Sequence, residues 1–201
     1  FIAIRNLYNF LRRDYEIPKN LFEDIKAKPP KNNLPVDELI LPEDVKSLVD
    51  SANTQRNRAL VMLLWDSAAR IGEILGLNLS HVTFDKYGAI LIVSGKTGMR
   101  RIRLIDSVPD LQLWINQHPD RDNPKAALFV TDRKQGGKFK RLDPQSVNTL
   151  LIGLAEKAEV KKKVHPHAFR HGRLTDLAKQ GFNEMELRIF AGWEKSSAMP
   201  A

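Results

Sequence analysis

Apolar residues recur at spacings of three and four in several stretches of the chain, which is the period of an amphipathic helix. The pattern predicts helices over residues 1–27, from Pro42 to about residue 52, over 56–66, and from Arg70 to Leu75. Further helices are expected over 107–118, from Pro144 to about residue 158, over 166–180, and up to Phe190. The 56–66 segment is apolar nearly all round, which indicates a buried helix.

Local signals mark the ends of several of these helices. Asp143 followed by Pro144 suits a helix start, because the carboxylate caps free backbone N–H groups and proline tolerates the first turn. Asn183 with Glu186 three residues later is close to a capping box. Gly76 and Gly181 stand where helices are expected to stop.

The period changes to two between residues 89 and 105. Residues 89–93 predict a strand, residues 94–98 supply turn residues, and residues 101–105 alternate as a second strand, so the segment predicts a β-hairpin. The alternation puts Arg101 and Arg103 on one face, and Ile102 with Leu104 on the other. The expected fold class is therefore mainly α with a small antiparallel β-sheet (α+β).

The first helix stands apart from the rest. Residues 28–35 contain three prolines among polar residues, which is typical of a linker. Residues 1–27 are too few to bury their own apolar stripe, and the chain does not begin with Met. We therefore expect residues 1–27 to be the C-terminal remnant of a preceding domain, and residues 36–201 to form the main domain.

Composition narrows the class of protein. Hydrophobic content of 42% and charged content of 28% are ordinary for a globular protein. The net charge of +8 favours a polyanionic partner. The chain has no cysteine, which excludes disulfides and thiolate chemistry. No stretch reaches the ~20 apolar residues that a membrane helix needs, so we expect a cytoplasmic protein without membrane contact.

Candidate chemistry gathers in three short motifs. On a helix His167, Arg170 and His171 share one face, being three and four residues apart. Arg70 and Trp193 add a second forked donor and an indole N–H, a set that suits a phosphate gaining negative charge. Taken alone, two histidines at this spacing could also bind a metal or be purely structural. Residues 161–163, three lysines, could be a solvated face or a grip on phosphates.

The order of these motifs resembles the catalytic domain of the tyrosine recombinases, the phage integrase family. The resemblance rests on Arg-Ile-Gly-Glu at 70–73, a lysine in a β-hairpin, His-x-x-Arg-His at 167–171 and Gly-Trp at 192–193, and covers residues 36–201. It implies the fold of that domain, with residues 1–27 belonging to an N-terminal core-binding domain for DNA.

The resemblance also implies a role for each matching residue. Arg70 and Arg170 are similar to the two catalytic arginines, Lys96 to the hairpin lysine, His167 to the catalytic histidine, and Trp193 to the residue that is either His or Trp. Glu73 and His171 are similar to residues that support the site. The remaining cations are expected to contact the DNA backbone: Arg100, Arg101, Arg103, Lys161, Lys162 and Lys163.

One element of the family pattern is not in the chain. The nucleophilic tyrosine is expected about nine residues after Trp193, just beyond Ala201, whereas Tyr8, Tyr15 and Tyr87 lie elsewhere. The resemblance implies a site-specific recombinase or integrase that breaks and rejoins double-stranded DNA as a homotetramer, through a 3′-phosphotyrosyl intermediate. Neither a metal nor another cofactor is expected. Alternatives are an inactive DNA-binding module of the same fold, a type IB topoisomerase, or a basic helical protein with accidental matches.

Overall fold

The computed structural model describes residues 8, 10, 11, 15, 38–95 and 98–193. The chain divides into one unit of residues 1–33 with 200–201, and a second of residues 34–199. Of the first unit, Tyr8, Phe10, Leu11 and Tyr15 are described, and all four are helical. The rest of the expected helix over 1–27, the expected linker over 28–35, and Lys96 lie outside the described residues.

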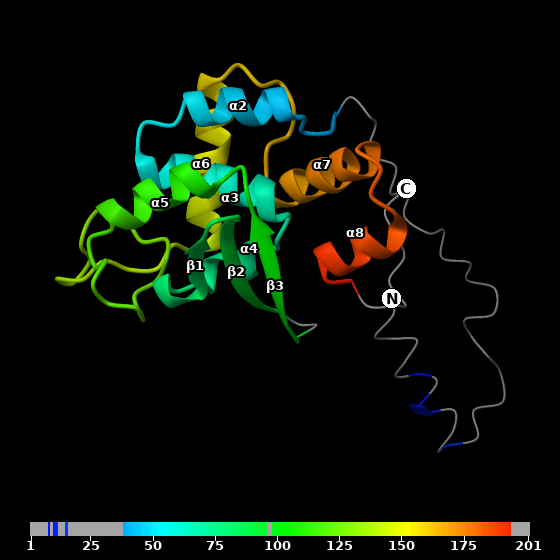
Figure 1. Ribbon diagram of the computed structural model, residues 1–201, viewed down its shortest axis with the longest axis horizontal. Coiled ribbons are helices and arrows are strands. Elements are labelled where there is room, and N and C mark those ends of the chain that lie inside the picture. The colour runs from blue at the N-terminus through cyan, green and yellow to red at the C-terminus, as the bar shows by residue number, and fades with distance from the viewer. Residues whose placement is uncertain (1–7, 9, 12–14, 16–37, 96–97, 194–201) are drawn as a thin grey trace. The chain divides into compact units, whose positions relative to one another are not determined.

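The second unit is built around one buried helix, α3 (Gln55–Ser67). Leu60, Leu63 and Leu64 are fully buried, as the all-round apolar pattern predicts. Helices α2 (Pro42–Asp50), α5 (Val108–Gln117) and α7 (Pro166–Lys179) pack against α3 (Figure 1). The short helix α4 (Ile71–Leu75) follows α3 directly, and α6 (Pro144–Lys157) contacts both α2 and α4.

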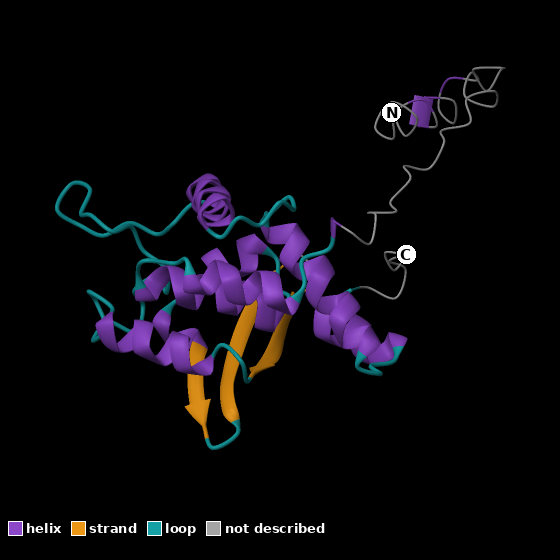
Figure 2. Ribbon diagram, turned by 90° about the horizontal axis from the view of Figure 1, so that it is seen from above, coloured by secondary structure: helices purple, strands orange, loops and turns teal. Residues whose placement is uncertain are grey.

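The sheet has three antiparallel strands in the order β1 (Val82–Asp85), β2 (Gly88–Gly95) and β3 (Gly98–Leu104). A 3₁₀ turn, η2 (Leu79–His81), leads into β1. The hairpin of β2 and β3 was predicted, and its register pairs Leu91 with Ile102. Helices gather on one side of the sheet (Figure 2). Ile102 and Leu104 are buried on that side, whereas Arg101 and Arg103 are exposed, as the alternation predicts.

Helix α8 (Glu184–Ala191) packs on α7. The motif at 167–171 lies on α7, and the Gly-Trp motif at 192–193 follows α8. The Asn183 side chain accepts from the Glu186 N–H, so the predicted capping box forms. Leu174, Leu177 and Leu187 bury a small apolar cluster together with Ala68, the residue that ends α3. This cluster fixes α7 and α8 against the segment that leads to Arg70.

The fold is thus mainly helical with one small antiparallel sheet, and the predicted fold class is confirmed. Strand β1 was not predicted. Between α5 and α6 the chain follows turns with isolated bridges, and Arg141 ties this region to α4 by donating to the Leu75 and Leu77 carbonyls. Among the described residues no helix is both long and apolar enough to cross a membrane.

Candidate functional site

Arg70 lies at the start of α4, held by the helix that follows it. Its backbone N–H donates to the Glu73 carboxylate at 2.8 Å, and its Nη1 lies 3.2 Å from the other carboxylate oxygen of Glu73. Glu73 is buried, whereas the Arg70 side chain is 36% exposed. The carboxylate therefore braces the base of Arg70 and leaves its guanidinium open to solvent.

A second arginine, on the sheet, also binds the Glu73 carboxylate. Arg100 on β3 donates both Nη groups to Glu73, at 2.7 and 2.9 Å, in a bidentate pair. The Glu73 carboxylate also lies directly against the backbone of Gly95, where a side chain on residue 95 would overlap it. The carboxylate therefore lies at the end of β2, where Gly95 is the last residue of the strand.

The charges around Glu73 keep it ionised. Burial alone raises the pKa of its carboxyl, but the Arg100 hydrogen bonds, the Arg70 N–H and the two guanidinium charges together lower the pKa below its usual value. Glu73 also acts on Arg170 by its charge, so Arg70, Arg100, Arg170 and this one carboxylate together carry a net charge of about +2. Such a positive site attracts an anion.

Arg170 reaches the site from α7 and is buried. It donates to the carbonyl of Ala68 at 2.6 Å and to the carbonyl of Ala191 at 2.8 Å, so it ties the end of α3 to the end of α8. Burial, with Arg70 and Arg100 adding positive charge, lowers its pKa to about 10, and Glu73 opposes the shift. The two arginines predicted as catalytic, Arg70 and Arg170, are therefore neighbours in the fold.

Trp193 follows Gly192, which ends α8 in the left-handed region at φ 64°. The Arg170 guanidinium lies 5.6 Å from the centroid of the Trp193 ring. The face of the Arg100 guanidinium packs on Gly192, where a Cβ would lie 2.8 Å from Nη1. Trp193 thus lies beside Arg170.

The predicted histidines lie on the same helix as Arg170. His167 is exposed and His171 is half-buried. Burial lowers the pKa of His171, and His167, Arg170 and His165 lower it further by their charge. His165, which sequence reasoning did not single out, has its pKa lowered by burial, His167 and Lys163. Among the described residues no group of three or more His, Cys, Asp or Glu could hold a metal ion.

The cations expected to contact DNA differ in their surroundings. Arg101, Lys161 and Lys163 are exposed. Arg103 pairs with Asp85 of β1 at 2.6 Å, and Lys162 pairs with Asp44 of α2 at 2.5 Å. Arg100 points to the opposite face of β3 from Arg101 and Arg103 and is engaged with Glu73. The alternation of the strand contained this signal, because residue 100 has the parity of Ile102 and Leu104.

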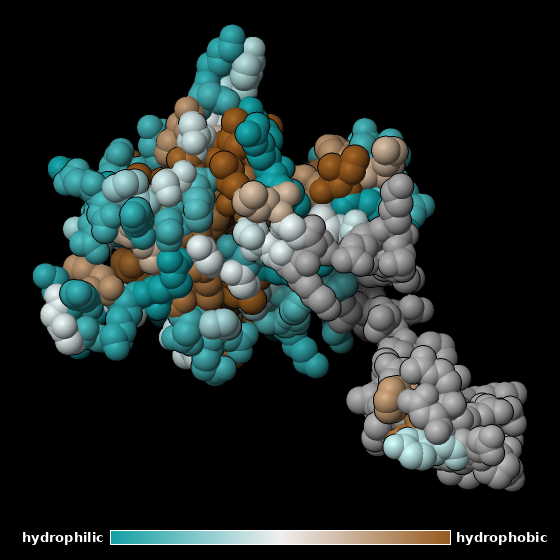
Figure 3. Space-filling model, turned by 90° about the horizontal axis from the view of Figure 1, so that it is seen from below, coloured by the Kyte–Doolittle hydropathy of each residue, from teal (hydrophilic) through white to brown (hydrophobic). Residues whose placement is uncertain are grey.

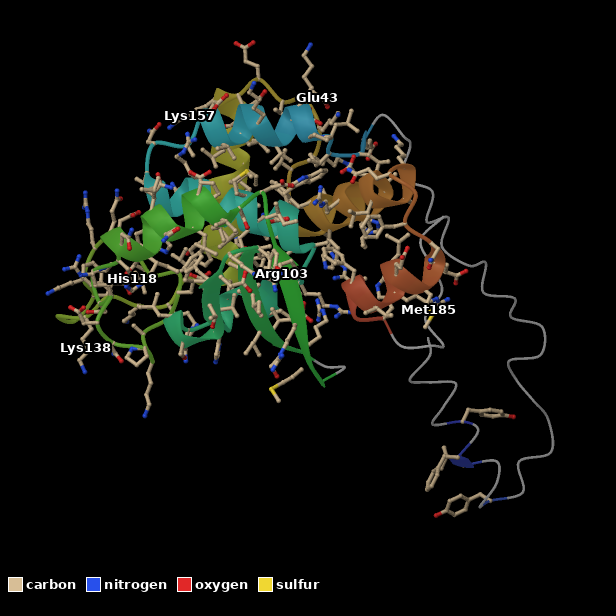
Figure 4. The ribbon with its side chains drawn as sticks, viewed as in Figure 1. Glu43, Arg103, His118, Lys138, Lys157 and Met185 are labelled. Carbon is tan, nitrogen blue, oxygen red and sulfur yellow. The ribbon has the colours of Figure 1, made fainter. Side chains whose placement is uncertain are left out.

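A groove separates β3 from α7 and α8 beside the site. In Figure 4 the labels of Arg103 and Met185 locate β3 and α8, the elements on its two sides. The cavity has a volume of about 740 Å³. Its walls include Ile105, Phe182 and Ile189, which are exposed apolar residues. In a view from below, hydrophilic side chains flank a narrow band of apolar ones (Figure 3).

Asp66 lines this groove, and its carboxylate binds the backbone that follows β3. Its Oδ2 accepts from the Ile105 N–H, the Ser107 N–H and the Ser107 hydroxyl, all within 3.0 Å. Arg173 lies 3.7 Å from the other oxygen. The buried carboxylate joins the end of β3 and the start of α5 to α3, four residues before Arg70.

Comparison with known proteins decides the family. The profile of the Phage integrase family matches residues 38–199, which is most of the chain and contains every motif described above. The chain belongs to this family. The tyrosine recombinase XerC of Anoxybacillus flavithermus is 29% identical over 191 residues, covering 89% of this chain and 61% of that protein. The tyrosine recombinase XerD of Mycobacterium tuberculosis is 30% identical over 195 residues, covering 90% and 60%.

Solved structures show the same fold as this integrase-family chain. XerA recombinase superposes with a TM-score of 0.70 at 22% identity, covering 96% of this chain and 66% of that one. The Tn1549 transposon integrase in complex with a circular intermediate DNA gives 0.74 at 20% identity, covering 97% and 69%. The chain spans about three fifths of the length of the curated relatives it matches.

Proposed function

We propose that this chain is the catalytic part of a site-specific DNA recombinase that breaks and rejoins double-stranded DNA through a 3′-phosphotyrosyl intermediate. The observation that supports it best is that Arg170 lies beside the Trp193 ring and feels the charge of Arg70, which Glu73 holds, in a chain of the Phage integrase family. A net charge of about +2 beside a half-buried indole suits a phosphodiester better than a neutral ligand.

The arginines act on the non-bridging oxygens of the scissile phosphate. Attack on phosphorus builds negative charge on these oxygens, and Arg70 and Arg170 supply fixed, charged donors to them. The indole N–H of Trp193 adds a neutral donor. Loss of one such donor typically costs ~2.7–4 kcal/mol of transition-state stabilisation, which is about 10²–10³ in rate.

The reaction needs two proton transfers. A tyrosine hydroxyl attacks phosphorus and passes its proton to His167, while the bond from phosphorus to the 5′ oxygen breaks and Lys96 protonates that oxygen. His171 supports the site from behind His167. The products are a phosphotyrosyl ester at the 3′ end and a free 5′ hydroxyl, which can attack the ester and reverse the step. The bond energy is kept in the ester, so the residues need no cofactor.

The nucleophile and the assembly complete the proposal. Tyr87, the described tyrosine of the second unit, is 67% exposed in the turn between β1 and β2, away from the site. We expect the attacking tyrosine just beyond Ala201, residues 1–27 to belong to a DNA-binding domain, and residues 28–35 to link it to the catalytic domain. Four copies would assemble on two duplexes, which light scattering of the complex with DNA would test.

Covalent capture tests this function. The protein extended past Ala201 is mixed with a pool of nicked duplexes of random sequence, because the target site is unknown, and adducts that resist detergent are isolated and sequenced. We expect a 3′ adduct through a tyrosine soon after Ala201. Arg121→Gln changes one exposed cation far from the site and should capture DNA like the parent. The absence of any adduct, or attachment through another residue type, would refute the mechanism.

The same preparation distinguishes the alternatives. Duplex binding without an adduct favours the inactive DNA-binding module. Relaxation of a supercoiled plasmid without exchange between two duplexes favours the type IB topoisomerase. Exchange between duplexes that carry the captured sequence supports the recombinase.

The exposed cations give a separate test of DNA binding by this chain. We propose that Arg101, Lys161 and Lys163 contact phosphates. Arg103 and Lys162 contribute less to DNA binding, because each is already in an ion pair. Each lost phosphate contact lowers the slope of log K against log salt by about 0.9. Arg101→Gln should therefore reduce the slope by about one and Arg103→Gln by less, and equal effects would contradict this ranking.

A further inference from the structure

Arg100 is placed differently from the arginines beside it on β3. Arg101 and Arg103 are exposed, whereas the Arg100 side chain is 14% exposed and lies on the face that packs against the helices. Its two Nη groups are both donated to Glu73. The Glu73 carboxylate thus offsets the charge of Arg100, whereas the two Nη groups of Arg170 donate to neutral carbonyls and leave its charge for a phosphate.

The guanidinium of Arg100 contacts two parts of the site at once. One edge holds Glu73, which in turn holds the backbone and the guanidinium of Arg70. Its face packs on Gly192, the residue before Trp193. Arg100 itself lies on β3, the second strand of the hairpin.

The Nε of Arg100 is a further sign of this placement. It is buried and has no hydrogen-bond partner among the described residues. Buried donors are nearly always paired, so an unpaired one calls for an explanation, which a role in the site can supply.

We propose that Arg100 is a positioning residue for DNA cleavage, which acts through Glu73 and Gly192 on Arg70 and Trp193 and makes no contact with DNA. The inference rests on the proposed function. An arginine suits this role because its planar fork fixes both carboxylate oxygens while its flat face packs on a glycine. A lysine in the same place could hold only one point of the carboxylate.

Rates and affinities of the extended protein separate positioning from phosphate contact. With the DNA captured by the parent, Arg100→Met should lower the rate of covalent capture at saturating DNA by about 10²-fold, because small misplacements of a catalytic group cost this much. The affinity for DNA and the slope of log K against log salt should equal those of Arg121→Gln, which removes the same charge at an exposed site. Arg100→Lys should fall between Arg100→Met and the parent.

A double variant tests whether Arg100 works through Glu73. If it does, Arg100→Met combined with Glu73→Gln should be no slower than the slower single variant, because both changes break the same link. Rate losses that multiply would overturn the proposal. So would a salt slope lowered by about 0.9 in Arg100→Met, which would make Arg100 a phosphate contact, or a capture rate equal to the parent's.

Tryptophan fluorescence tests the positioning without any cleavage. Trp65 and Trp114 are buried and Trp193 is half-buried, so the neutral quencher acrylamide acts mainly on Trp193. Arg100→Met should raise the quenching constant of this chain, since the turn at Gly192 loses its support. If the parent captures no DNA, the proposed function fails and this measurement alone decides the role of Arg100. An unchanged quenching constant would overturn it.

Discussion

Replacing Arg170 by Met should slow catalysis far more than it destabilises the fold. The side chain makes two hydrogen bonds, to the Ala68 and Ala191 carbonyls. Bonds from a charged group contribute about 1.5–3 kcal/mol each, so the pair contributes about 3–6 kcal/mol. Burial and the charges of Arg70 and Arg100 act against the guanidinium, and the pKa of about 10 that results corresponds to roughly 3 kcal/mol of unfavourable interaction. The net loss of unfolding free energy should be about 0–3 kcal/mol.

Two measurements on the same variant check this balance. Urea unfolding of this chain gives the change in stability, and covalent capture by the protein extended past Ala201 gives the change in rate. We expect a rate lower by about 10²–10³, because one fixed donor to the phosphate is lost. A stability loss of about 5–6 kcal/mol, close to the full contribution of the two hydrogen bonds, would show that no such offset exists. A parent-like rate would remove Arg170 from the site.

Three further predictions concern this chain alone, and urea unfolding measures each of them. Asp66→Ala leaves three donors, two of them on the buried Ser107, without their acceptor and should cost about 3–5 kcal/mol. Asp66→Asn keeps an oxygen for them, and an equal loss would contradict the assignment. Gly192→Ala should lower the unfolding free energy by about 1–2 kcal/mol because of the left-handed backbone, and by more because the new Cβ overlaps Arg100. The control Gly136→Ala is at φ 62° with open space around it, so it should lose only the backbone contribution. The folded state binds protons less readily at His171 than the unfolded chain does, because its pKa is lowered, so stability should decline as the pH falls below about 6.5. His171→Gln should flatten this decline, and an unchanged slope would count against it.

The local parts of the fold were predictable because local physics decides them. The apolar stripe of α3, the capping box at Asn183 and the alternation in β3 each depend on residues within one turn or one strand. These predictions needed no knowledge of which elements pack together. The grouping of Arg70, Arg170 and Trp193 into one site had a different source, the resemblance to the tyrosine recombinases.

The long-range contacts were not predictable in the same way. Nothing near Asp66 in the sequence indicates that its carboxylate accepts from residues 105 and 107. The alternation of β3 could have placed Arg100 on the inner face, but its partner Glu73 lies 27 residues away and becomes a neighbour only when α4 packs on β2. Strand β1 is four residues long and was missed because so short a segment has little periodicity.

The backbone of Ala68 offers a way to change this site without touching any atom that faces a phosphate. Ala68 ends α3 at φ 44°, a left-handed conformation that costs a residue with a Cβ roughly 1–2 kcal/mol. Its carbonyl is the one that receives Arg170, and the chain turns there toward Arg70. A substitution at residue 68 that changes its preferred backbone conformation would thus shift both arginines together and leave the chemistry of each intact.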